Sequence, residues 1–306
     1  LNINYSFIEN ILPIFLYVLF LLFLFTLYKK TNLTSLEFNI ISLSSTVNLL
    51  FTQLNIDLII LLLVFYFVRY YKSYPNIYLT LLFFLALLKQ HPIGIFFGLF
   101  FTANNFRKIT KFSLFIISFL LINFYFYNLD VNYLNGQPRP THAQLASGLL
   151  SISQYIWIEF FDRAIGFRLV IFILAIIILI IFTTLIFKKK TVKFNLNKNI
   201  YTDNQFEGGV LGWFLFISIY ANWDYRNTIL LLVFIYFNLN QNYKFPLIGL
   251  LLVTPFSPNL PLFLTYIMTA IKYFLYIVSV FVCLLMIIKL DRKYFKFLDV
   301  ILRNRE

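Results

Sequence analysis

The chain contains 306 residues, of which 61% are hydrophobic, 21% are aromatic and only 12% are charged. Soluble domains have about a quarter of their residues charged, so this chain lacks the polar surface of a soluble domain and is predicted to be an integral membrane protein. Its net charge of +13 comes with Lys and Arg residues in short clusters at the ends of apolar runs. That distribution is typical of cytoplasmic loops and argues against a nucleic-acid-binding protein.

Apolar runs in the first part of the chain predict a series of membrane spans, because roughly 20 mostly apolar residues suffice for a helix to cross the hydrocarbon core. In chain order these spans are residues 11–28, a weaker segment at 39–52, 54–68, 77–88, 92–103 and 112–128. Each basic cluster is predicted to lie inside, since cytoplasmic loops are enriched in Lys and Arg. The clusters here are Lys29-Lys30, Arg69 with Lys72, and Arg107-Lys108 with Lys111.

The second part begins with a long outer connection, residues 129–165, that holds few basic residues. A span at 166–187 returns to a cytoplasmic loop at 188–207, which begins with Lys188-Lys189-Lys190. Further spans follow at 208–221, 228–238, 245–255 and 260–290, and a basic cytoplasmic tail covers 291–306. We therefore predict an all-α fold, a polytopic helical bundle of about 10–11 membrane segments that forms one integral membrane domain over residues 1–306.

The first polar motif is Thr52-Gln53-Leu54-Asn55-Ile56-Asp57, at the start of an apolar run. Polar residues within or beside membrane spans are costly and are functional candidates by default. We expect Gln53 and Asn55 to line a site for a sugar or a phosphate, with Asp57 positioning a neighbour. The alternative is a helix N-terminus, in which Thr52 or Asn55 caps the helix and Asp57 interacts with the helix dipole.

The second motif is Lys89-Gln90-His91-Pro92. Pro92 ends the preceding helix, because proline lacks an N–H donor and disfavours helical backbone at His91. Lys89 is predicted to bind a lipid-linked phosphate as a point charge, with His91 as an additional donor; alternatively, Lys89 extends its chain to the membrane interface. His91 and His142 are the only histidines and no acid lies at ligand spacing, so no metal site is expected. Nucleotide-binding fingerprints are absent too, so no cofactor is expected.

The third motif is Asn222-Trp223-Asp224-Tyr225-Arg226, between two apolar runs. Arg226 offers a planar fork for a phosphate, and Asp224 is expected to orient it or to hold sugar hydroxyls. Trp223 or Tyr225 would stack on the sugar. An aromatic belt at the membrane interface with a local ion pair is the alternative.

The order and spacing of these motifs resemble the Gly-Gln-x-Asn and Leu-Lys-x-x-Pro core of glycosyltransferase family 87. That family comprises the polyprenol-phosphate-mannose-dependent mannosyltransferase-like proteins of the GT-C superfamily. The resemblance covers residues 49–237, and Thr52 replaces the usual glycine. The matching residues are Gln53, Asn55, Lys89 and Pro92, followed by Asn222, Tyr225 and Arg226 of an Asn-x-x-Tyr-Arg stretch.

The resemblance implies a GT-C fold and a multi-pass enzyme of the inner or plasma membrane. Such an enzyme transfers a sugar, here expected to be mannose-like, from a polyprenyl-phosphate donor to a glycan or glycolipid acceptor on the non-cytoplasmic face. The family places a catalytic carboxylate upstream of a helix such as 11–28, but the only acid before residue 11 is Glu9. Leu1 is also predicted to lie outside. We therefore expect a preceding span and catalytic loop to be missing, and the catalytic base stays unassigned.

Two other functions fit a polytopic bundle. An O-antigen-polymerase-like or ligase-like protein would rely on arginines of the outer connection and its flank, namely Arg139, Arg163 and Arg168. A transporter or flippase would show matching internal repeats with broken helices, and no such repeat is evident. The outer connection also carries two carboxylates of interest, Glu159 and Asp162.

Overall fold

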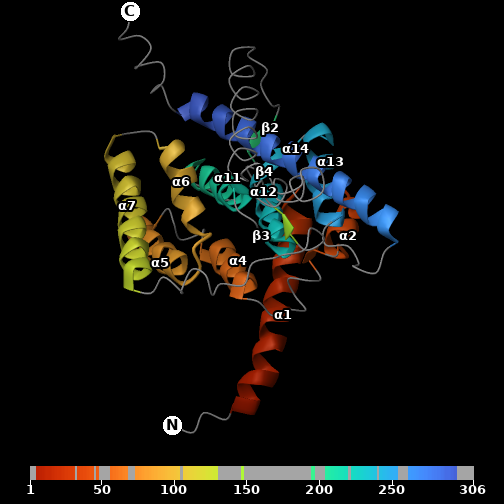
Figure 1. The fold of residues 1–306 in the computed structure, drawn as a ribbon, viewed down its shortest axis with the longest axis horizontal. Coiled ribbons are helices and arrows are strands. Elements are labelled where there is room, and N and C mark those ends of the chain that lie inside the picture. The colour runs from red at the N-terminus through yellow and green to blue at the C-terminus, as the bar shows by residue number, and fades with distance from the viewer. Residues whose placement is uncertain are drawn as a thin grey trace, which may run out of the picture.

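The protein is described here from a computed structural model. It covers residues 5–31, 33–44, 46–47, 56–67, 73–103, 106–129, 146–147, 194–196, 204–219, 222–239, 241–253 and 261–294. These ranges contain ten α-helices, one 3₁₀-helix and two short strand pairs (Figure 1). The all-α prediction is therefore confirmed for the described part of the chain. The predicted span 166–187 and most of the outer connection 129–165 lie outside the described residues.

The first six described helices are α1 (Tyr5–Lys30), α2 (Ser35–Ser42), α4 (Ile56–Phe67), α5 (Pro75–Leu88), α6 (Ile93–Phe101) and α7 (Phe106–Leu129). Five of them follow predicted apolar runs with shifts of up to six residues at their ends. By contrast, α2 shares only residues 39–42 with the predicted segment 39–52. Arg107 and Lys108 lie in the first turn of α7 rather than in a loop. Glu9 lies inside α1 rather than ahead of it.

The second part of the chain departs further from the predicted spans. Its elements are β1 (Ala146–Ser147), β2 (Phe194–Leu196), α11 (Asn204–Ile219), β3 (Asn222–Trp223), η2 (Asp224–Ile229), α12 (Leu230–Tyr236), β4 (Phe237–Leu239), α13 (Gln241–Val253) and α14 (Leu262–Tyr294). The predicted span 228–238 is instead the end of a 3₁₀-helix, a short α-helix and a strand. The last helix continues past residue 290, so the start of the predicted tail is helical.

Helices α5, α6 and α7 run in alternating directions, as the basic clusters predicted. The N-terminal parts of α5 and α7 lie together, because Lys111 Nζ of α7 donates a hydrogen bond to Asn76 Oδ1 of α5. Beyond the last turn of α5, Gln90 Nε2 donates to Asn123 Oδ1 near the end of α7, at 3.3 Å. Helices α5 and α7 therefore run in the same direction, and α6, which connects them along the chain, runs in the opposite direction.

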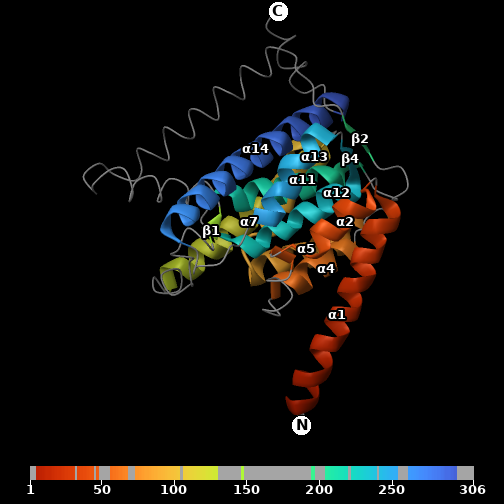
Figure 2. The ribbon, with the colours of Figure 1, turned by 90° about the vertical axis from the view of Figure 1, so that its right-hand side faces the viewer.

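The two strand pairs join segments that are far apart in the sequence. Strand β1 pairs antiparallel with β3, with Ser147 opposite Asn222, and β2 pairs antiparallel with β4, with Asn195 opposite Asn238. Figure 2 shows β1 and the β2–β4 pair on opposite sides of the bundle. The first pair joins two segments that were both predicted to be outside, and the second joins two segments predicted to be inside.

Helices α6 and α11 approach so closely that only glycine fits between them. A Cβ atom on Gly98 would lie 2.0 Å from the backbone oxygen of Gly208, and one on Gly212 would lie 2.4 Å from Gly98 Cα. Each helix carries a Gly-x-x-x-Gly pattern, Gly94 with Gly98 and Gly208 with Gly212. Small residues at this spacing let two helix backbones come into contact within a membrane. This contact fixes α6 against the buried helix α11.

Apolar side chains are buried around the centre and exposed around the rim. Every residue of α12 is buried, as expected of a helix that is apolar on all sides. By contrast, α1, α7 and α14 expose many large hydrophobic side chains. By length and composition, two helices among the described residues could cross a membrane, Phe106–Phe126 and Phe263–Ile287. Only 11% of the α7 segment is buried, against 44% of the α14 segment.

An ion pair connects α2 to α13. Thr34 and Glu37 form a capping box at the start of α2, and Lys244 Nζ donates to both Glu37 carboxylate oxygens at 3.1 and 3.2 Å. Burial alone would raise the pKa of Glu37, but the Thr34 backbone N–H and Lys244 outweigh it and hold the pKa below its usual value. A carboxyl group with a lowered pKa stabilises the fold above its unfolded-state pKa of about 4.3.

Glu37→Gln is expected to lower the free energy of unfolding by about 1 kcal/mol at neutral pH, because glutamine preserves the capping box but loses the ionic contact. The difference between wild type and variant should disappear as the pH falls through the folded-state pKa of Glu37, where the wild-type carboxylate is also neutralised. Chemical unfolding in detergent at several pH values measures this. In a Lys244→Met background the Glu37→Gln change should have little effect at any pH; a full effect there would contradict the assignment.

Candidate functional site

Asp57 lies in the first turn of α4 and is only 5% exposed. An acidic residue is favourable at this position because it interacts with the positive end of the helix dipole. Neighbouring helices hold α4 in place: Tyr66 donates to the Leu19 backbone oxygen of α1, and Tyr78 of α5 donates to the Val64 backbone oxygen. The carboxylate therefore has a fixed position in the bundle.

The break between α5 and α6 places Lys89 and His91 beside Asp57. Lys89 has extended backbone after the last turn of α5, and Pro92 is the N-cap residue of α6. The prediction that the helix before Pro92 ends ahead of this proline is therefore confirmed, because α5 ends at Leu88. Because the chain turns back here, both side chains project from one end of the helix pair.

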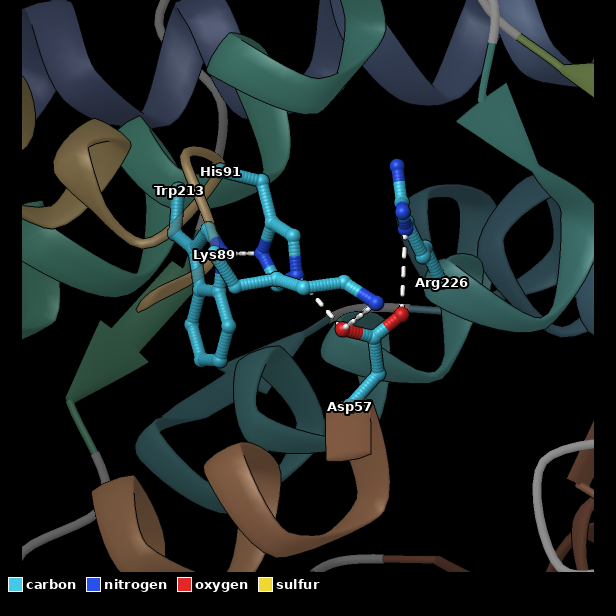
Figure 3. A network of polar contacts seen from close by, with 5 residues as sticks. All are labelled: Asp57, Lys89, His91, Trp213 and Arg226. Carbon is cyan, nitrogen blue, oxygen red and sulfur yellow. Dashed lines mark hydrogen bonds and ion pairs between the residues drawn. The ribbon is translucent and has the colours of Figure 1, made fainter. Parts of the chain in front are cut away.

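Arg226 comes from a third part of the chain, in the 3₁₀-helix η2. Its Nε donates to Asp57 Oδ2 at 3.1 Å. On the other carboxylate oxygen, His91 Nε2 lies 2.8 Å and Lys89 Nζ 3.5 Å from Asp57 Oδ1. Figure 3 shows these side chains converging on the carboxylate. We refer to Asp57, Lys89, His91 and Arg226 as the Asp57 cluster.

His91 uses both ring nitrogens within the protein. The Trp213 indole N–H of α11 donates to His91 Nδ1 at 2.9 Å, and the two rings are nearly parallel. An indole nitrogen can only donate, so Nδ1 is unprotonated and Nε2 carries the proton that is donated to Asp57. His91 lies in the connection between α5 and α6, and burial lowers its pKa although Asp57 acts in the opposite direction. The neutral imidazole therefore orients the carboxylate.

The Asp57 cluster combines two cations, one anion and one neutral ring, so it carries one net positive charge. Side-chain exposure is 27% for Lys89 and 17% for Arg226, against 4% for Asp57. The cations are thus the part of the cluster that solvent or a ligand can reach. Such an arrangement suits the binding of an anion. In the described ranges no group of three or more His, Cys, Asp or Glu residues could hold a metal ion.

The structure brings together three of the residues predicted to bind substrate, Lys89, His91 and Arg226. Gln53 and Asn55 lie outside the described residues. Immediately before Arg226, the backbone of Asn222 lies in β3 and the backbones of Asp224 and Tyr225 lie in η2. The side chains of these three residues and of Glu9 lie outside the described part of the chain.

Sequence reasoning missed Trp213 and the central position of Asp57. Asp57 was expected to position one neighbouring residue, and it contacts three, namely Lys89, His91 and Arg226. Trp213 follows Gly212, and a Cβ on Gly94 would lie 2.8 Å from Trp213 Cα. The two Gly-x-x-x-Gly patterns were the available signal that α6 and α11 pack together near His91.

Comparisons of the chain with protein-family models, with curated proteins and with solved structures gave no match.

Proposed function

We propose that the protein is a multi-pass membrane glycosyltransferase that transfers a mannose-like sugar from a polyprenyl-phosphate donor to a glycan or glycolipid acceptor on the non-cytoplasmic face. One observation carries the proposal. Lys89 and Arg226 belong to motifs that are 137 positions apart in the printed sequence, and both contact the same buried carboxylate. The chemistry of their motifs predicts that these two residues bind the donor phosphate.

The chemistry of the two cations suits a phosphate. Lysine supplies a compact point charge, whereas arginine supplies a planar array of donors. Asp57 engages Arg226 through Nε, and the end of the guanidinium points away from the carboxylate (Figure 3). A phosphodiester carries one negative charge, which the single net positive charge of the Asp57 cluster would balance. When the sugar leaves, the same cations would stabilise the charge that develops on the lipid phosphate.

The exposed apolar helices support a location in the membrane. A core helix of a soluble protein is mostly buried, whereas only 11% of the α7 segment Phe106–Phe126 is buried in the bundle. Exposed side chains on this helix include Leu114, Leu121 and Phe124. A face of this kind is costly in water and favourable in lipid.

The location of the Asp57 cluster supports sugar transfer on the face opposite the helix ends that carry the basic clusters. Lys89 follows the last turn of α5, whereas the Lys111–Asn76 contact lies at the first turn of that helix. Arg226 follows β3, which pairs with β1 in the outer connection. The reacting sugar would therefore be on the non-cytoplasmic side.

Lys89→Ala and Arg226→Ala are each expected to reduce sugar transfer from radiolabelled polyprenyl-phosphate mannose by roughly 100-fold, because each removes a cation at the developing charge. Membranes from cells that express the full chain serve for the assay, with label transferred to endogenous acceptors as the readout. Two exposed cations away from the cluster, Lys29 and Arg107, provide matched alanine controls that should transfer normally.

Unchanged transfer in both the Lys89 and Arg226 variants would remove the phosphate assignment. Label that crosses the membrane on its lipid without reaching an acceptor, and does so independently of Lys89, would favour a flippase instead. Loss of transfer in the Lys29 and Arg107 controls would point to a general effect of positive charge.

A further inference from the structure

The Trp213–His91 hydrogen bond connects the Asp57 cluster to α11. Trp213 is 1% exposed and His91 is 7% exposed, so neither is placed to meet a ligand in bulk solvent. We propose that Trp213 is a positioning residue, which fixes His91 as the neutral Nε2–H tautomer and thereby keeps Asp57 placed to hold Lys89 and Arg226. The proposal rests on the proposed function for its effect on the donor, but its structural part stands separately.

Hydrogen bonding determines the tautomer. If Nδ1 carried the proton, its N–H would face the indole N–H of Trp213 across 2.9 Å, and two donors would oppose each other. The bare Nε2 would then face the Asp57 carboxylate oxygen at 2.8 Å, and two acceptors would oppose each other. Both contacts are satisfied only when Nε2 is protonated and Nδ1 is not.

The same contact disfavours the imidazolium form. Protonation of Nδ1 would place a donor against the Trp213 N–H, and a hydrogen bond to the neutral form of a group disfavours its charged form. Among the described residues, the charged groups that act on His91 are Asp57 from α4, Arg226 from η2 and Lys89 from its own connection. A charged His91 would add a third cation beside one carboxylate and would compete with Lys89 for Asp57 Oδ1.

Backbone packing holds the indole in place. A Cβ on Gly94 would lie 2.8 Å from Trp213 Cα, so this turn of α6 rests directly on the backbone of α11. His91 lies three positions before Gly94 in the same connection. The contact between α6 and α11 therefore holds the Trp213 N–H donor and the His91 acceptor close together.

Histidine-selective nitrogen-15 labelling tests the tautomer directly, because the chain has only two histidines. The full chain in lipid nanodiscs should give two imidazole signals, and a His142→Gln background should leave that of His91. We expect one protonated and one unprotonated nitrogen, with the proton on Nε2, and no titration of the ring across the neutral range. A protonated Nδ1 at neutral pH would overturn the proposal.

Trp213→Phe keeps an aromatic ring but removes the N–H donor. The pKa of His91 should then rise, so that its signal titrates at a higher pH than in the wild type, and the KM for polyprenyl-phosphate mannose should increase at least tenfold as the pH is lowered. Phe214→Leu, a buried neighbour on α11 that contacts Tyr276, is the packing control and should leave the His91 titration unchanged. An unchanged titration in Trp213→Phe would refute the role of Trp213.

Two replacements of His91 distinguish its role in positioning Asp57 from a role in packing. They also test the proposal if the Trp213→Phe variant does not fold. Glutamine offers a neutral N–H donor for Asp57 and an acceptor for Trp213, whereas phenylalanine preserves only the ring. We expect His91→Gln to retain most donor binding without pH dependence and His91→Phe to lose it. The reverse order would show that the ring serves only for packing. If the tautomer is as expected but no variant affects donor use, the proposed function fails and the positioning of Asp57 stands.

Discussion

Asp57→Ala is expected to lower the free energy of unfolding by about 3 kcal/mol, because it removes the buried carboxylate that two partly buried cations share. Lys89, His91 and Arg226 would lose their shared partner at once. Arg226→Met should cost less, about 1 kcal/mol, since Asp57 keeps the other two contacts. Chemical or thermal unfolding of the full chain in detergent measures both changes.

The central role of Asp57 predicts strong non-additivity. Once Asp57 is alanine, Arg226→Met should cost less than it does in the wild type, because the ion pair between the two residues is already lost. The double variant Asp57→Ala, Arg226→Met should therefore lose less stability than the two single losses added together. Additive losses would show that Arg226 is held by other groups and that the Asp57 cluster does not act as a unit.

Gly98→Ala is expected to destabilise the protein by about 2 kcal/mol or more, the effect of overpacking a rigid contact. The added Cβ would meet backbone atoms of Gly208 and Gly209 at 2.0 to 2.8 Å, and these cannot move without separating α6 from α11. Since His91 and Trp213 lie at the same helix contact, donor use should fall together with stability. Unfolding in detergent and the transfer assay measure the two effects.

Gly249→Ala provides a matched control for this change. Gly249 also lies in an apolar helix, α13, but the three atoms nearest to its added Cβ would all belong to the flexible side chain of Leu275, at 3.1 to 3.9 Å. Alanine is a better helix former than glycine, so this variant should be as stable as the wild type or slightly more stable. A Gly98→Ala variant as stable as Gly249→Ala would contradict the close contact of α6 and α11.

Apolar runs and the position of proline predicted most of the described helices, because both depend on local properties, but the predicted spans 39–52 and 228–238 do not match the structure. Pro92 determines locally that α5 ends ahead of it. In the same way, α4 starts just before Asp57, whose charge favours the first turn of a helix. The strand pairs were not predictable in this way. Strands of two or three residues carry no periodic pattern, and their partners are far away along the chain.

The choice of ion-pair partners also depended on tertiary structure. Arg226 pairs with Asp57, 169 positions away, and no sequence pattern connects residues so far apart. That Asp224 orients Arg226 stays a prediction, because the Asp224 side chain lies outside the described part of the chain. Trp213 gave no signal of its own as one aromatic residue in an apolar run. Its role follows from the glycine contact that places α11 against the connection of His91.

Binding of a polyprenyl phosphate to the Asp57 cluster is the most direct test of the proposed function. Equilibrium binding of radiolabelled polyprenyl phosphate to the full chain in nanodiscs should be saturable, and the uncharged polyprenol should not compete. Two lost charge-assisted contacts should weaken binding roughly 100-fold or more in the Lys89→Ala, Arg226→Ala double variant, while Lys29→Ala, Arg107→Ala binds as the wild type does. Equal affinity in the wild type and the Lys89, Arg226 double variant would contradict the proposal.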